Sequence, residues 1–129
     1  MSELAHRLRT GAAPARVEAA RLLARDAAAA AACAADLVSA AAADDEELRE
    51  WATAALEDCG PPAVDQWDAL AQLAAGGNAD SAYWAVTLLG RAGAAAATHL
   101  PALRTIAERH AAATVRKRAQ WAVERMEGK

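Results

Sequence analysis

The side chains that most often carry chemistry are few in this chain and lie far apart. The chain of 129 residues has three histidines and two cysteines, and the cysteines lack the spacing of a zinc or redox motif. His99 and His110 fall in one expected helix, where a rise of 1.5 Å per residue separates them by about 16 Å, too far to share a metal. No glycine-rich phosphate loop and no serine nucleophile turn is present. We therefore expect no catalytic residues, no metal, no cofactor and no enzymatic activity.

Carboxylates that could act as a general acid and base are concentrated in residues 44–47. They stand where a helix is expected to begin, and Asp44 and Glu47 have the spacing of a capping box. Acidic side chains in a first turn also favour the helix dipole. Helix capping therefore explains these residues better than catalysis does.

The charges are distributed unevenly along the chain. Residues 44–68 contain nine acidic residues against one arginine, and residues 114–129 contain five basic residues against two acidic ones. An acidic middle is unfavourable for a continuous phosphate-binding surface. Nucleic acid is therefore an unlikely partner, and the alternative of nucleic-acid binding depends on the basic C-terminal helix.

Two columns of apolar residues recur along the chain with one period. Leu4, Leu37, Leu70 and Leu103 are each 33 residues apart. A small residue followed three and four positions later by an apolar pair begins at Ala19, Ala52, Ala85 and Ala119, with offsets of 33, 33 and 34. Such a period is typical of stacked repeat units.

The composition favours helices throughout. Alanine accounts for 42 residues and phenylalanine for none. Alanine has the highest helix propensity, and the residues that favour strands are sparse. We expect an all-α protein with two helices in each period, one of them running from Asp26 through the alanine tract to about Ala43. The expected helix caps are Asp26, Asp44 or Asp45, Asn78 or Asp80, Thr98 and Thr114.

The repeated pattern resembles that of HEAT-like repeat proteins, in particular the bacterial form also found in phycobilisome lyases. The resemblance is carried by residues 48–56 and 115–123, which share an arginine, two alanines and a terminal apolar residue, and by Gly90. It implies a right-handed α-solenoid that forms a single domain, with four helix–turn–helix units at about residues 1–26, 27–60, 61–93 and 94–129. Ankyrin and tetratricopeptide repeats have similar periods, but their signatures are absent.

Helical projection places one column of the second helices opposite the core, and this column includes Tyr83, Thr87 and Lys117. The resemblance implies that the second helices line a concave surface. Aromatic residues in such a place are typical interface anchors, although Trp51 and Trp84 could instead fill space between neighbouring units. The candidate partner-binding residues are Glu50, Trp51, Tyr83, Trp84, Lys117 and Trp121.

Three arginines, Arg16, Arg49 and Arg116, recur at one position of the period, where unit three has Ala82. They could bind an anionic partner, but the resemblance implies bonds within or between repeats, to acidic groups or to carbonyl groups at the turns, and this is the favoured interpretation. We expect a cytoplasmic scaffold protein without membrane contact, which binds a protein or peptide on its second helices. Self-association is a further possibility, because neither end of the array shows an obvious cap.

Overall fold

The computed structural model describes residues 3–128, which contain helices and no strands. The predicted all-α class is therefore confirmed. The α-helices are α1 (Glu3–Thr10), α2 (Ala13–Leu23), α3 (Ala27–Ala32), α4 (Ala34–Ala40), α5 (Glu46–Asp58), α6 (Trp67–Ala75), α7 (Ala79–Ala92), α8 (Leu100–Arg109) and α9 (Ala113–Met126). Two 3₁₀ segments, η1 (Val64–Gln66) and η2 (Gly93–His99), precede α6 and α8.

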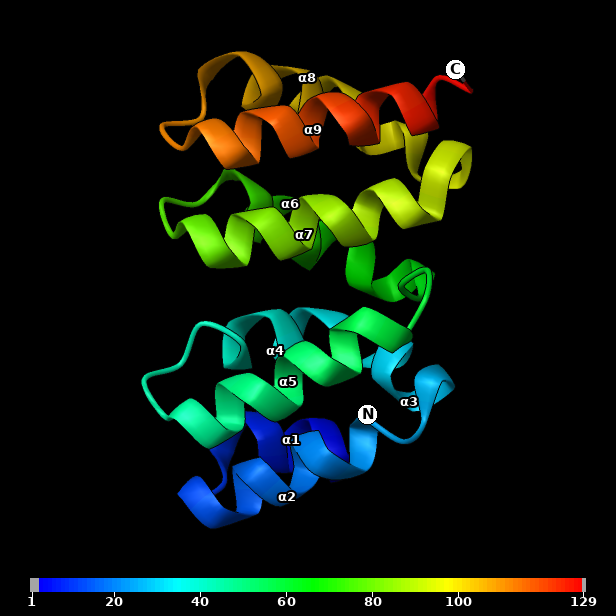
Figure 1. The fold of residues 1–129 in the computed structure, drawn as a ribbon. Helices are drawn as coiled ribbons and strands as arrows, with labels where there is room; N and C mark the ends of the chain where they lie inside the picture. Colours follow the sequence, from blue (N-terminus) through cyan, green and yellow to red (C-terminus); the bar gives the residue numbers. More distant parts are fainter. Residues whose placement is uncertain (1–2, 129) are drawn as a thin grey trace.

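The helices form two layers. Figure 1 shows α2, α5, α7 and α9 following one another in the nearer layer, with α1, α4, α6 and α8 behind them. The core lies between the layers, because both periodic columns point there. Leu37, Leu70 and Leu103 are buried, as are all four alanines of the second column. Within residues 3–128, none of the helices combines the length and the apolar character that crossing a bilayer requires.

Two helices of the nearer layer, α5 and α7, begin with a side chain that accepts a hydrogen bond from a backbone N–H group. Asp45 caps α5 by accepting from Leu48 N at 3.0 Å, and Asn78 caps α7 by accepting from Ser81 N at 2.9 Å. The predicted threonine caps are wrong. Thr98 lies inside η2 and Thr114 lies inside α9, whose N-cap is Ala112.

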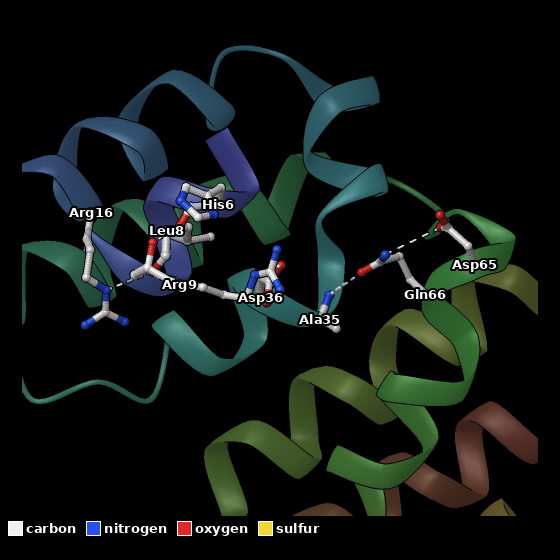
Figure 2. A network of polar contacts seen from close by, with 9 residues as sticks. His6, Leu8, Arg9, Arg16, Ala35, Asp36, Asp65 and Gln66 are labelled. Atoms are coloured by element: carbon white, nitrogen blue, oxygen red, sulfur yellow. Dashed lines mark hydrogen bonds and ion pairs between the residues drawn. The ribbon is translucent and has the colours of Figure 1, made fainter. Parts of the chain in front are cut away.

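The alanine tract forms two helices, whereas the sequence predicted one. The break is at Cys33, with φ −118° and ψ 22°. A continuous helix would join Ala35 N to Ala31 O, but the segment before α6 takes both groups. Ala63 N donates to Ala31 O at 3.1 Å, and Ala35 N donates to Gln66 Oε1 at 3.0 Å, a bond drawn in Figure 2. Contacts with the next unit therefore outweigh the helix propensity of alanine.

Candidate partner-binding surface

The arginines that recur at one position of the period donate hydrogen bonds to carbonyl groups at or near the turns between the two layers. Arg16 Nε donates to Leu8 O at 2.8 Å, drawn in Figure 2, and Arg49 Nη1 donates to Ala43 O and Asp44 O at 2.9 and 2.8 Å. Arg116 Nη1 donates to two carbonyl oxygens after α8, at 2.6 and 3.1 Å. Carbonyl groups in a turn lack the partners that a helix provides, so each guanidinium supplies a hydrogen-bond donor at its turn. The structural interpretation of these arginines is confirmed.

Helix α7 has no arginine at the equivalent position, and a histidine that follows α8 binds the equivalent carbonyl group. His110 Nδ1 accepts from Ala112 N at 3.0 Å, so Nε2 carries the proton and donates to Gly76 O at 3.0 Å. Gly76 lies 33 residues after Ala43, whose oxygen binds Arg49. His110 therefore supplies Gly76 O with the donor that the buried Ala82 cannot supply.

A second pair of arginines, which the sequence interpretation missed, joins neighbouring second-layer helices. Arg91 of α7 donates from Nη1 to Leu56 O of α5 at 2.6 Å, and Arg125 of α9 donates from Nε to Gly90 O of α7 at 3.0 Å. The two arginines are 34 residues apart, which is the signal that could have revealed them. Each binds the C-terminal end of the helix before it.

The junction between α7 and α9 is closed by Trp121. Its ring lies over Gly90, and a methyl group at that position would clash with it. Two guanidinium groups lie over the same ring, those of Arg118 at 3.9 Å and Arg125 at 5.2 Å from the centroid. The glycine therefore lets an aromatic ring fill the space between two helices.

The junction between α5 and α7 is different, and the two helices make few contacts with each other. The reason appears in the three positions of each second helix that face the following one. In chain order these positions are Ala20, Leu23 and Ala24; Thr53, Leu56 and Glu57; Val86, Leu89 and Gly90; and Gln120, Val123 and Glu124.

The first and third sets are small or apolar, and α2–α5 and α7–α9 pack closely. In the second set Glu57 stands in the place of Gly90. A carboxylate cannot be buried between helices without a partner, and it stays exposed. The last set lies on the outer side of α9, with Gln120 and Glu124 exposed. Polar residues on such a face are typical of a terminal repeat.

The open junction forms a cleft of about 480 Å³, which we call the acidic cleft. Its lining residues are Ala41, Arg49, Glu50, Thr53, Glu57, Asp80 and Trp84. Glu50, Glu57 and Asp80 form no ion pair with any residue in the described part of the chain. Arg49 uses its guanidinium on carbonyl groups, so three carboxylates are available to a ligand.

A second hollow, of about 270 Å³, lies between α7 and α9, and we call it the basic hollow. Its lining residues are Tyr83, Thr114, Lys117, Arg118 and Trp121. Arg118 is held there by a hydrogen bond from its Nε to Thr87 Oγ1 at 2.9 Å. Its Cζ also lies 5.4 Å from the Tyr83 ring centroid.

The structure brings five of the six candidate residues to these two places. Glu50 and Trp84 line the acidic cleft, whereas Tyr83, Lys117 and Trp121 line the basic hollow. Trp51 lines neither, and it packs half-buried against the core. The three candidate tryptophans and Tyr83 are half-buried, so each side chain has a packing role as well as an accessible part.

Thr87 was predicted to be exposed, and this is wrong, because it is 1% exposed. Its hydroxyl donates to Tyr83 O at 2.8 Å and accepts from Arg118 Nε. Projection of a single helix could not show that α9 covers this residue.

The first-helix layer has a separate hollow of about 440 Å³, near the break at Cys33. Its polar groups bind one another, as Figure 2 shows. Arg9 Nε lies 3.5 Å from Asp36 Oδ2, and Gln66 binds both Ala35 N and Asp65. Burial raises the pKa of Asp36, and the charge of Arg9 opposes this shift. Since these groups are already paired, the hollow is a weaker candidate than the acidic cleft.

Comparison with protein-family models and with curated proteins finds no match for the chain. Within residues 3–128, no three histidine, cysteine or acidic side chains gather closely enough to hold a metal ion. The resemblance to HEAT-like repeats therefore stays a prediction, and the geometry of the site is the basis for any statement about function.

Proposed function

We propose that this protein is a non-catalytic scaffold of HEAT-like type, a four-unit α-solenoid that binds a protein or peptide on the surface of its second helices. The 33-residue period and the succession of α2, α5, α7 and α9 in one layer support this architecture. Units of this kind bury their apolar sides by stacking and leave an extended surface for a partner.

The acidic cleft is the observation that carries the proposal. It lies at the loosely packed junction of α5 and α7, and it combines three carboxylates that form no ion pair within residues 3–128 with the indole of Trp84. Carboxylates attract lysine and arginine, and an aromatic ring binds a cation over its face. We therefore propose that a basic side chain of the partner enters this cleft.

Arg49 is the one arginine that lines the cleft, and a further guanidinium group, that of Arg91, lies near Trp84. Arg91 Cζ lies 5.9 Å from the Trp84 ring centroid, and Nη1 binds Leu56 O at the end of α5. A cation of the partner would find Glu50, Glu57 and Asp80 on the remaining walls. Exposed ion pairs contribute about 0.2–1 kcal/mol each, so strong binding needs several contacts along the surface.

Nucleic-acid binding is less well supported. Arg116, Arg118 and Arg125 each use one nitrogen on a carbonyl or hydroxyl group within the protein, so these basic residues of α9 also have structural roles, and Lys117 and Arg125 are exposed beside them. The carboxylates of the acidic cleft lie in the same layer and would repel phosphate groups.

Site-specific photocrosslinking tests the proposal. A photoreactive amino acid at Thr53, in the cleft, is expected to capture a partner from the native cell, whereas the same group at the exposed Ala102 of α8 captures none. The triple variant Glu50→Gln, Glu57→Gln and Asp80→Asn is expected to lose that capture while keeping its helical circular dichroism. Equal capture at both positions, or capture that the triple variant retains, contradicts the proposal.

A further inference from the structure

We infer that the partner segment has a fixed charge order across α7: a basic side chain in the acidic cleft and an acidic side chain in the basic hollow. This inference rests on the proposed function and adds the chemical class of the second contact. The two sites lie on either side of one pair of residues, Tyr83 and Trp84.

Tyr83 and Trp84 are consecutive in α7, so their side chains point about 100° apart around the helix. Trp84 lines the cleft toward α5, and Tyr83 lines the hollow toward α9. Their rings meet edge to face, with centroids 6.3 Å apart and planes at 85°. One segment that crosses α7 would therefore contact both rings.

Arg118 is prepared to bind a carboxylate. Nε is occupied by Thr87, and the guanidinium lies over the Trp121 ring at 3.9 Å. Among residues 3–128, no hydrogen bond occupies its two Nη groups. These groups form a planar fork, which matches the two oxygens of a carboxylate. Holding the fork in place before binding lowers the entropy cost of the contact.

The class of the acidic group follows from the proposed partner. Arg118 and Lys117 supply two positive charges in the basic hollow, and the carboxylates of the acidic cleft lie beyond Trp84. The proposed partner is a protein or peptide, and the acidic side chains that it ordinarily supplies are carboxylates, which the planar fork of Arg118 can bind with both oxygens. The acidic group is therefore assigned to an aspartate or glutamate side chain of the partner.

Thr87 is a positioning residue in this arrangement. Its hydroxyl fixes the direction of the Arg118 fork, but it is buried and out of reach of a ligand. Thr87→Val keeps the size of the side chain and removes the acceptor. Lys117→Gln removes an exposed charge without disturbing the fork.

Synthetic peptides test the inference. One contains two arginines, a glycine–serine spacer of three to six residues and two glutamates. Its comparison peptides contain only the arginines or only the glutamates. Binding is followed through the indole N–H signals of Trp84 and Trp121 in two-dimensional NMR. The mixed peptide is expected to bind about tenfold more tightly than the arginine peptide. A spin label at its basic end should broaden Trp84, and one at its acidic end should broaden Trp121.

The variants separate this inference from the proposed function. Thr87→Val and Lys117→Gln are each expected to remove most of the gain from the glutamates, while leaving the affinity for the arginine peptide within about twofold. Equal affinity for the mixed and arginine peptides, or a mixed peptide that a phosphoserine version outcompetes, overturns the inference and leaves the acidic cleft standing. Loss of all peptide binding together with loss of Thr53 capture overturns the proposed function.

Discussion

The indole ring of Trp121 in α9 lies directly against Gly90 in α7. The absence of a side chain at Gly90 provides the space for the ring. The same glycine supplies the carbonyl oxygen that Arg125 binds at 3.0 Å. Position 90 therefore determines both the spacing of the two helices and one of the polar bonds between them.

Gly90→Ala is expected to destabilise the protein, although alanine is favoured over glycine by about 1 kcal/mol within a helix. The new methyl group would displace the Trp121 ring, and overpacking of this kind costs about 1–3 kcal/mol. Urea unfolding followed by circular dichroism measures the net effect. Gly77→Ala is the control, because a methyl group there meets open space. A Gly90→Ala protein that is more stable than the original would contradict the close packing of the ring.

Replacing the polar residues that face α7 should close the acidic cleft. Thr53→Val combined with Glu57→Ala makes this set of positions resemble Ala20, Leu23 and Ala24, so α5 and α7 can pack. We expect a gain in unfolding free energy of about 1 kcal/mol and loss of the arginine-peptide affinity. Glu50→Ala removes a carboxylate without changing this face and should leave stability within about 0.5 kcal/mol. Unchanged stability of the double variant would show that these residues do not keep the helices apart.

Asp36→Asn is expected to stabilise the protein at neutral pH. Burial raises the pKa of Asp36 above its usual 3.8, so the folded state binds this proton more tightly than the unfolded state. The contribution of this group to stability is therefore most favourable at low pH and is lost as pH rises through the raised pKa. Urea unfolding at pH 7 and at about pH 4 should show a larger advantage for the variant at pH 7. Asp58→Asn is the surface control, and an advantage that grows at the lower pH would contradict the sign.

The two thiols are expected to react slowly with a thiol reagent in the folded protein and rapidly in urea. Cys33 is 2% exposed and Cys59 is 6% exposed. Burial also raises the pKa of Cys59, which lowers the fraction of reactive thiolate, with Arg91 opposing the shift. Labelling with a chromogenic disulfide at pH 8, in the chain and in its Cys33→Ala variant, follows each thiol. Immediate labelling of Cys59 in the folded state would show that the end of α5 is open.

The period predicted part of the core: Leu37, Leu70, Leu103 and the four alanines are buried, whereas Leu4 is half-buried. The role of Arg49 and its equivalents was implied by the resemblance to HEAT-like repeats. The break at Cys33 could not be predicted, because the competing bonds come from residues 63 and 66, far along the chain. The burial of Thr87 likewise depends on α9.

The acidic cleft was partly accessible from the sequence. Glu50 and Trp84 were identified as candidates, but the projection of a single helix does not show which positions face the neighbouring helix. Comparing the positions that face the next helix would have shown that Thr53 and Glu57 interrupt an apolar series. Trp51, by contrast, shares its period position with Trp84 and still lines no cleft, because the cleft exists at one junction and not at the other.

The loose contact between α5 and α7 has a mechanical consequence. The two halves of the molecule are joined there through α4, which packs against α6 and α7, and through Arg91. Bending of the molecule is therefore expected to concentrate at this junction, which would act as a hinge. A cation bound by both Glu57 of α5 and Asp80 of α7 would connect the two helices and restrict that bending. Partner binding would then stiffen the whole protein, and amide exchange in α5 and α7 would slow together.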